Sequence, residues 1–286
     1  MLDELIEQAI EQKKIINKVD PRVTALDIDE ETDKPVIYIF ISDLHVGALG
    51  TDYEALRDLI KFLREHSYVK VIFGGDLYDN FLHFKSLKGA NDSVYSPSVQ
   101  LEIIALLVEE LESRDQLRVL GLGNHGVNRE EKAVGYSILK KRVVAVRHKI
   151  FEGMGFVNIK VGNEIYRGVI SHKGKGHSHI NPLHGGMRLA RLANLPDFVF
   201  YGHEHVPASG IYVENRREII VLKGGTYQTR SAYIEREYNI GVGGHIRTQM
   251  IIFFPDRHKK VFFDCPDDAI LYYEALMGKY EKHDTK

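Results

Sequence analysis

The sequence has no long apolar run and only one cysteine. An uninterrupted stretch of about 18 apolar residues, which a membrane helix needs, is absent, and the first residues mix Glu and Lys with Leu and Ile, unlike a secretory signal. Cys265 has no second cysteine to pair with, so we expect a small buried side chain in a reducing compartment. These absences predict a cytoplasmic protein without a membrane partner.

An excess of positive charge is also absent. The formal net charge is -2, which argues against a chain coated with cations, so a nucleic-acid partner would have to meet a local patch. One such segment runs from Ile165 to Pro196, which contains no Asp or Glu. Its basic residues are Arg167, Lys173, Lys175, Arg188, Arg191, His172, His177, His179 and His184. The segment either contacts phosphate groups or balances the carboxylates of a metal site.

Internal repeats and low-complexity linkers are missing too. The 286 residues therefore predict a single domain, 1–286. Apolar residues at helical spacing predict an N-terminal helical extension over 1–18. A closing helix begins near Asp267 and, with its tail, occupies 267–286.

Three apolar, β-branched runs each lead into a polar loop that contains glycine. They span 36–41, 69–73 and 117–120, and they predict buried, parallel strands. Asp43 and His45 follow the first run, Asp76 the second, and Asn124 the third. Because the ends of such strands share one rim of a sheet, we expect these side chains to lie together.

Helical spacing fills the gaps between these strands. The predicted helices begin near Tyr53, at Pro97 and around Glu130. For the second helix, the apolar residues chosen as its core face are Val99, Ile103, Leu106, Leu107 and Leu111.

The second half of the chain has sequence patterns typical of β-strands. A Gly-Asn turn joins the runs 157–161 and 165–171, which predicts a hairpin that ends at His172. A short helix is expected over 187–195. Another apolar run, 198–201, leads into a Gly-His-Glu-His sequence with His203 and His205. Further strands are expected at 218–222 and 250–254.

Side chains at these strand ends are of the types that hold two metal ions. The candidate ligands are Asp43, His45, Asp76, Asn124, His172, His203 and His205. Mixed carboxylate, amide and imidazole groups suit Mn, Fe, Ni or Zn better than Ca, which prefers oxygen alone. Two divalent ions can neutralise a phosphate ester and lower the pKa of a bridging water, so the pattern predicts a phosphoesterase.

The ordered series Asp-x-His, Gly-Asp-x-x-Asp, Gly-Asn-His, a lone His and Gly-His-x-His, over about 36–206, resembles the calcineurin-like metallophosphoesterases. The resemblance implies an α/β fold in which two facing β-sheets are flanked by helices, a four-layer sandwich. It also implies that Asp76 bridges two metal ions, most often manganese, and that a metal-bridging hydroxide attacks phosphorus. One metal would be completed by Asp43, His45 and His205, and the other by Asn124, His172 and His203.

Two catalytic roles also come from the resemblance. His125 would face the substrate, to stabilise phosphoryl oxygens or protonate the leaving group, and Asp79 would orient its ring. Otherwise Asp79 is a turn or capping carboxylate. Many relatives continue Gly-Asn-His with an acid, whereas this chain has Gly126, so the hydrogen bond of that acid is absent or supplied elsewhere.

The substrate is left open between three classes. The basic segment, and a loop over 80–96 that mixes aromatic and cationic residues, favour a nuclease like the DNA-repair exonuclease branch of the family. The near-neutral charge favours a phosphatase or diesterase for a nucleotide, another small molecule or a phosphoprotein. A scaffold without catalysis is disfavoured by the intact ligand set. The sequence leaves the oligomeric state open.

Overall fold

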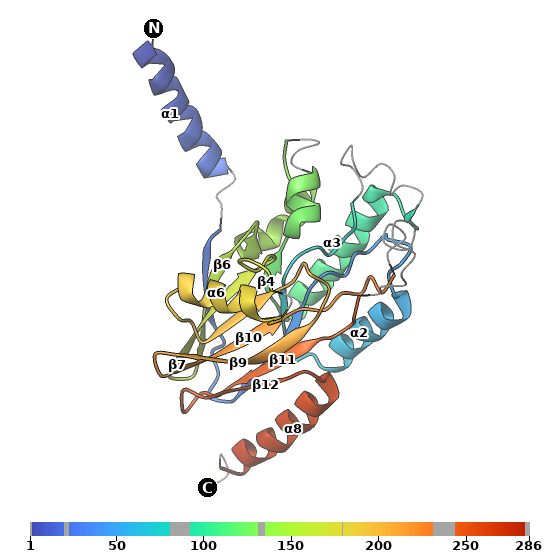
Figure 1. The fold of residues 1–286 in the computed structure, drawn as a ribbon, viewed down its shortest axis with the longest axis vertical. Coiled ribbons are helices and arrows are strands. Elements are labelled where there is room, and N and C mark those ends of the chain that lie inside the picture. Colours follow the sequence, from blue (N-terminus) through green and yellow to red (C-terminus); the bar gives the residue numbers. More distant parts are fainter. Residues whose placement is uncertain are drawn as a thin grey trace.

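The computed structural model describes residues 2–19, 23–80, 92–130, 135–178, 180–230 and 244–283. Two mixed sheets of six strands face each other, and helices cover their outer surfaces (Figure 1). This arrangement confirms the predicted α/β sandwich. Among the described residues, no helix combines the length and the apolarity needed to cross a bilayer.

The first sheet carries the parallel strands predicted from the three apolar runs. Its strand order is β12-β11-β2-β3-β4-β5. The bounds are β2 (Val36–Ile41), β3 (Lys70–Phe73), β4 (Leu117–Gly121), β5 (Ile150–Phe151), β11 (Gln249–Phe253) and β12 (Lys260–Phe263). Strands β2 to β5 are parallel to one another, while β11 pairs antiparallel with both β2 and β12. The carboxyl ends of β2, β3 and β4 therefore meet at one edge.

The second sheet has the order β1-β6-β7-β8-β10-β9. Its bounds are β1 (Ala25–Asp29), β6 (Gly155–Val161), β7 (Glu164–Ser171), β8 (Phe198–Tyr201), β9 (Ala208–Glu214) and β10 (Arg217–Lys223). Strands β6 and β7 form the predicted hairpin. Strand β8 runs parallel to both β7 and β10, so these three strands point their carboxyl ends the same way.

Three apolar clusters hold the layers together. One fills the space between the sheets and contains Phe40, Phe198 and Phe200, all at most 1% exposed. A second packs the first sheet against α2 (Tyr53–Glu65), α3 (Pro97–Ser113) and α8 (Pro266–His283), and a third packs the second sheet against α6 (His184–Leu192). Burial of this apolar surface is the main force that fixes the strands and so the loops at their ends.

The N-terminal helix α1 (Leu2–Val19) differs from the other helices. It projects away from the two sheets (Figure 1), and none of the three core clusters, as far as the chain is described, includes one of its residues.

Several details correct the sequence predictions. On α3, Val99 and Leu106 are 41% and 55% exposed, while the polar Gln100 is fully buried. Around the helix predicted over 130–140, the described residues form a π-helical turn (His125–Glu130), the short α5 (Ile138–Arg142) and a 3-10 helix (Val144–Lys149), while 131–134 lie outside the described residues. The short helix predicted over 187–195 is α6, which ends at Leu192, so the last three predicted residues lie outside it. Cys265, expected to be buried, is exposed.

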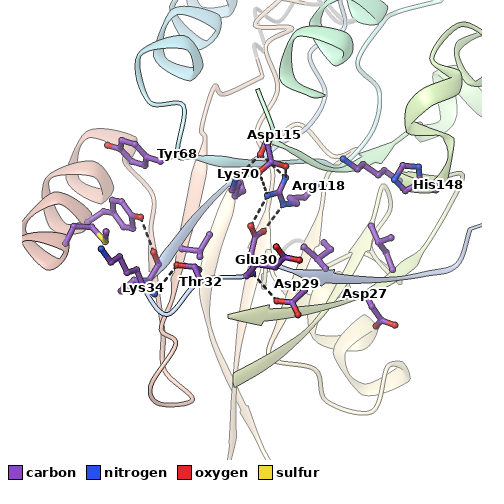
Figure 2. A pocket seen from close by; sticks show the side chains of 18 residues that line it. Asp27, Asp29, Glu30, Thr32, Lys34, Tyr68, Lys70, Asp115, Arg118 and His148 are labelled. Carbon is purple, nitrogen blue, oxygen red and sulfur yellow. Dashed lines mark hydrogen bonds and ion pairs between the residues drawn. The ribbon is translucent and has the colours of Figure 1, made fainter. Parts of the chain in front are cut away.

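An ion-pair network joins the two sheets at the edge opposite the carboxyl ends of β2 to β4. Glu30 directly follows β1, and its carboxylate accepts from Arg118 of β4 twice, at 2.8 Å each (Figure 2). Asp115 and Lys70 extend the network, and the hydroxyl of Tyr38 also donates to Glu30. A cavity of about 610 Å³ is lined by Glu30, Lys70, Asp115 and Arg118, whose four charges are paired with one another.

Candidate metal centre

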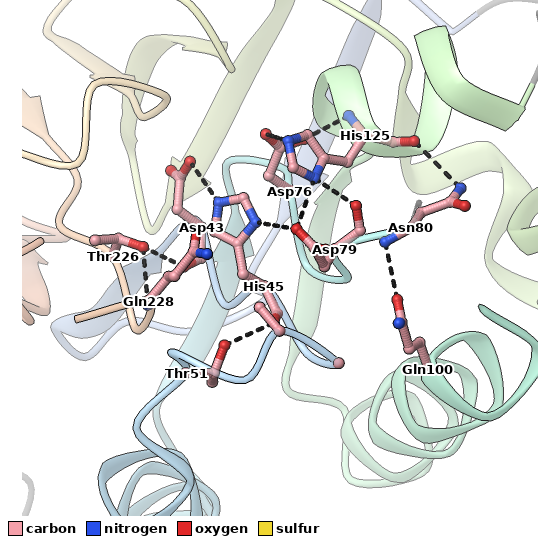
Figure 3. Close-up of polar contacts among 12 residues, drawn as sticks. Asp43, His45, Thr51, Asp76, Asp79, Asn80, Gln100, His125, Thr226 and Gln228 are labelled. Atoms are coloured by element: carbon pink, nitrogen blue, oxygen red, sulfur yellow. Dashed lines mark hydrogen bonds and ion pairs between the residues drawn. The ribbon is translucent and has the colours of Figure 1, made fainter. Parts of the chain in front are cut away.

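Two loops at the carboxyl ends of β2 and β3 continue side by side beyond the strands. The amide of Asp43 donates to the carbonyl of Gly75 at 2.9 Å, and the amide of His45 donates to that of Asp76 at 3.1 Å. An isolated bridge between Val46 and Tyr78 extends this pairing. The backbone thereby presents Asp43, His45 and Asp76 at one place (Figure 3).

The backbone of most predicted ligands is left-handed. The φ values are 54° at Asp43, 47° at His45, 49° at Asp76, 77° at His203 and 58° at His205. Residues other than glycine seldom adopt this region, which costs on the order of 1 kcal/mol each, and such residues gather at functional sites. Five of the seven residues that the sequence selects as ligands thus have strained backbone.

Glycines allow the loops to approach so closely. At Gly75, where φ is 112°, a Cβ atom would lie 2.7 Å from the backbone of Gly123 and 2.9 Å from the His172 ring. A Cβ atom on Gly202 would lie 2.3 Å from the Asp43 carboxylate. Both positions therefore require glycine.

One group of candidate ligands consists of Asp43, His45 and His205. The Nε2 atoms of the two histidines are 3.0 Å apart, and they lie 3.7 Å (His45) and 3.2 Å (His205) from Oδ1 of Asp43. Asp43 and His45 are almost completely buried. Donor atoms that bind one ion at about 2.1 Å lie roughly 3.0–3.4 Å apart, so the spacing fits a shared divalent cation.

The other group consists of Asp76, His172 and His203, with Asn124 beside them. Nε2 of His172 is 2.9 Å from Oδ2 of Asp76 and 3.0 Å from Oδ1 of Asn124. Asp76, His172 and His203 each offer a ligand atom within 4.8 Å of the others. The sequence-predicted ligands are thus brought together in the two sets that the resemblance implies.

Burial and mutual charge shift the pKa values of these groups. Burial opposes charge on His45, but hydrogen bonds with Asp43 and Asp79 outweigh it and raise the pKa of its imidazole to about 10. Burial would likewise raise the pKa of Asp43, yet His205 and His45 hold it well below its usual range. Burial, followed by the charges of His172 and Lys173, lowers the pKa of His203 to about 4. Buried carboxylates of this kind need cationic partners.

His125 and Asp79 lie next to both groups. Nδ1 of His125 is 2.6 Å from the carbonyl oxygen of Asp79 and 3.5 Å from its carboxylate, while Nε2 is 3.6 Å from Oδ2 of Asp76. The Asp79 carboxylate is also 3.6 Å from Nδ1 of His45. His45, Asp79 and His125 form a third group whose atoms could hold an ion. The contacts are compatible with Asp79 as the group that orients the His125 ring.

The residues present fit a pair of divalent cations. Ring nitrogens and carboxylate oxygens converge in each group, where the ligand atoms all lie within 4.8 Å of one another. The donor set mixes nitrogen and oxygen, as first-row transition metals prefer.

Three contacts around the site were not foreseen. Arg129, one turn after His125, donates to the carbonyls of Asp79 and Asn80. Gln100 is fully buried and accepts from the amide of Asn80 at 2.8 Å (Figure 3). The four-residue spacing of His125 and Arg129 was the one sequence signal for these contacts. Nothing in the sequence of the apolar helix α3 indicates that Gln100 is buried beside the site.

A buried ion pair supports the loop with two candidate ligands. Glu204 lies between His203 and His205, and its carboxylate binds the ammonium group of Lys223, which is 3% exposed. Nδ1 of His177 is 3.5 Å from the same carboxylate. Glu204 is thus occupied with hydrogen bonding.

The basic segment does not form one patch. Lys173 is exposed and close enough to His203 to affect its pKa, but Arg167 lies near the other end of β7. Arg191, on α6, is bound to Glu214 and Tyr212. His179 and most of the predicted aromatic loop, 81–91, lie outside the described residues.

Comparisons with known proteins found a family model and distantly similar solved structures. A family model described as calcineurin-like phosphoesterase matches residues 38–207. Vacuolar protein sorting 29 from Cryptosporidium parvum is 14% identical, with 82% of this chain and 94% of that chain covered and a TM-score of 0.43. A predicted phosphoesterase from Streptococcus pneumoniae is 16% identical, with 80% and 90% covered and a TM-score of 0.36. A protein serine/threonine phosphatase from Saccharomyces cerevisiae is 11% identical, with 91% and 88% covered and a TM-score of 0.39. No curated protein matches the chain.

Proposed function

Because the chain belongs to the calcineurin-like phosphoesterase family, we propose that it hydrolyses phosphodiester bonds at a centre for two divalent metal ions. The observation that carries this proposal is the convergence of two ligand groups at one edge of the sandwich. When bound, two such ions would neutralise the phosphate oxygens and lower the pKa of a water to make hydroxide available.

Each residue has a proposed task. Asp43, His45 and His205 would hold one ion, and Asn124, His172 and His203 the other. Asp76 is proposed to bridge them, because its backbone pairs with the His45 loop while Oδ2 contacts His172 at 2.9 Å. Manganese is the proposed metal, with iron, nickel or zinc compatible with the same donors.

His125 is proposed to act on the phosphate rather than on a metal. Its ring is 12% exposed, and the Asp79 carbonyl at 2.6 Å from Nδ1 holds it with Nε2 toward Asp76. From there Nε2 can stabilise phosphoryl oxygens or pass a proton to the leaving group. Asp79 is the proposed positioning residue for that ring.

DNA is the proposed substrate, which makes the activity a nuclease. Lys173 and Lys175 are exposed and directly follow His172, so they place positive charge beside the second ligand group. A phosphate backbone would be attracted to them, and such binding weakens steeply with salt.

One observation favours the alternative, a phosphatase or diesterase for a small molecule or phosphoprotein. Arg167 and Arg191 do not join Lys173 and Lys175, so the basic surface beside the ligands is smaller than the sequence predicts. A short substrate would need no more charge than this.

The test uses metal-stripped protein to which manganese is returned. Turnover of a chromogenic phosphodiester is compared with turnover of the matching monoester. We expect preference for the diester, followed by cleavage of labelled single- or double-stranded DNA that declines with salt. Preference for the monoester, with a Michaelis constant insensitive to salt, would contradict the nuclease and support the alternative.

A further inference from the structure

A second charged cavity lies at the opposite end of the second sheet from the candidate metal ligands. It has a volume of about 500 Å³ and lies where β7, β8 and β10 begin. The residues that line it are Ile165, Arg167, Leu195, Pro196, Asp197, Arg216, Arg217, Glu218, His258 and Lys260. Arg167 is five residues before His172, about 16 Å along an extended strand, so the cavity is separate from the metal centre.

Its arginines have no acidic partners. Within the described residues, Arg167, Arg216 and Arg217 form no ion pair with a carboxylate, although all three line one cavity. The nearby Asp197 carboxylate is already paired with other groups, because His258 lies 2.7 Å and Lys260 3.4 Å from the same carboxylate oxygen. Positive charge is left over in this cavity.

Two of these arginines meet at a single acceptor. Arg167 donates to the carbonyl of Leu195 at 3.4 Å, and Arg217 donates to the same oxygen at 3.3 Å. The carbonyl can accept both hydrogen bonds, but a neutral oxygen offsets neither positive charge, and no hydrogen bond of this kind involves Arg216 among the described residues. Two like charges held this close repel each other unless an anion lies between them.

Backbone strain marks the same place. Leu195 has a φ of 52° and Arg216 a φ of 61°, although neither residue type favours the left-handed region. Asn215 and Arg216 form the tip of the β9–β10 hairpin, where glycine would fit the second position without strain. Arg216 therefore occupies a position that suits glycine. Residues with such unfavourable backbone angles gather at functional sites.

We propose that this cavity, the arginine pocket, binds a diphosphate group, either free or as part of a nucleotide. Guanidinium groups match phosphate oxygens with paired hydrogen bonds, and two or more negative charges would offset the adjacent arginines. Ile165, Leu195 and Pro196 form an apolar wall that a nucleotide base can cover. A volume of about 500 Å³ suits a small ligand better than an extended nucleic acid.

The binding test uses titration calorimetry with pyrophosphate and with ADP. It is done on full-length Asp76→Asn protein in metal-free buffer, so that phosphate held by metal ions does not contribute. We expect one site per chain, weakened about tenfold or more in the Arg167→Gln/Arg217→Gln variant, since each lost charged hydrogen bond is worth that much. The control, Arg57→Gln, removes an arginine next to Asp58 outside the pocket and should bind normally. Tighter binding of ADP assigns a nucleotide, and equal binding assigns the free diphosphate.

Arg216→Gly supplies a readout that a purely structural arginine would not give. Glycine relieves the strain at the hairpin tip, so the unfolding temperature should rise while diphosphate binding weakens. Circular dichroism verifies the fold of each variant. The proposal is overturned if neither anion binds, or if binding is unchanged in the double variant. It is equally overturned if an oligonucleotide binds through these arginines and pyrophosphate fails to displace it.

Discussion

The two edges of the first sheet bury polar groups in opposite ways. At the amino ends of its strands, Glu30 and Arg118 are 2% and 10% exposed, and two hydrogen bonds of 2.8 Å join their opposite charges (Figure 2). At the carboxyl ends, the side chains of Asp43 and His45 are as deeply buried, but they face His205, a third group that could bind a metal ion, and the backbone is left-handed. The charge pair at the amino ends ties the sheets together, whereas the groups at the carboxyl ends have the types and spacing that could hold a metal ion.

The largest effect should come from removing the proposed bridging carboxylate. Asp76→Asn keeps the shape of the side chain and the oxygen that accepts a hydrogen bond of 2.8 Å from the backbone amide of His125, but it removes the negative charge. Activity should fall about a thousandfold or more, because several kcal/mol of charge stabilisation are lost. Metal content by mass spectrometry should fall below one ion per chain. Full activity in this variant would refute the metal-centre assignment, and an unchanged biological role would favour a scaffold.

Loss of the Glu30–Arg118 ion pair at the opposite edge should change stability alone. Glu30→Gln leaves the guanidinium of Arg118 buried with only Asp115 as its acidic partner, and should lower the free energy of unfolding by about 3 kcal/mol. Urea unfolding measures this loss. Metal content and turnover should be unchanged, and a change in either would show that the two edges are coupled.

His125→Ala should separate chemistry from metal binding. Turnover is expected to fall about a hundredfold, the usual scale for a lost general acid. The metal content of the variant should equal that of the wild type. Loss of metal would instead identify His125 as a ligand, in the third group with His45 and Asp79.

A smaller effect is expected from the ion pair under the Gly-His-Glu-His loop. Lys223→Met leaves Glu204 without its buried partner, so the flanking histidines should be held less firmly. Metal affinity should fall about tenfold, the low end for groups that orient ligands. Lys175→Met, an exposed lysine beside the site, is the matched control and should bind metal normally. Equal affinities in the two variants would remove Lys223 from the support of the site.

Strands buried on both faces were predictable from the sequence, and edge strands were not. The residues of β2 and β8 are buried throughout, so they form continuous apolar runs. The edge strands β1, β9 and β12 are largely half-buried or exposed, and their patterns resemble loops. The π-helical turn after Asn124 was also missed, because tertiary contacts set its period.

The grouping of the ligands was predictable for a different reason. Each candidate follows a strand, and parallel strands deliver their ends to one edge, as Asp43 and Asp76 illustrate. The face of α3 was not predictable, because apolar residues surround this helix and only packing selects Leu107 over Leu106. Likewise, no feature of the sequence around Arg167 shows that it lines a different surface from Lys173 and Lys175.

The contact between His45 and His205 joins positions 160 residues apart in the chain. Closing so long a loop is slow and depends on the strands that lie between. Neither group of ligands is complete before the second sheet has closed onto the first, so a metal ion cannot serve as the nucleus for folding. During synthesis the chain must first build a sandwich that holds its strained loops unaided, and only the finished fold can select its metal.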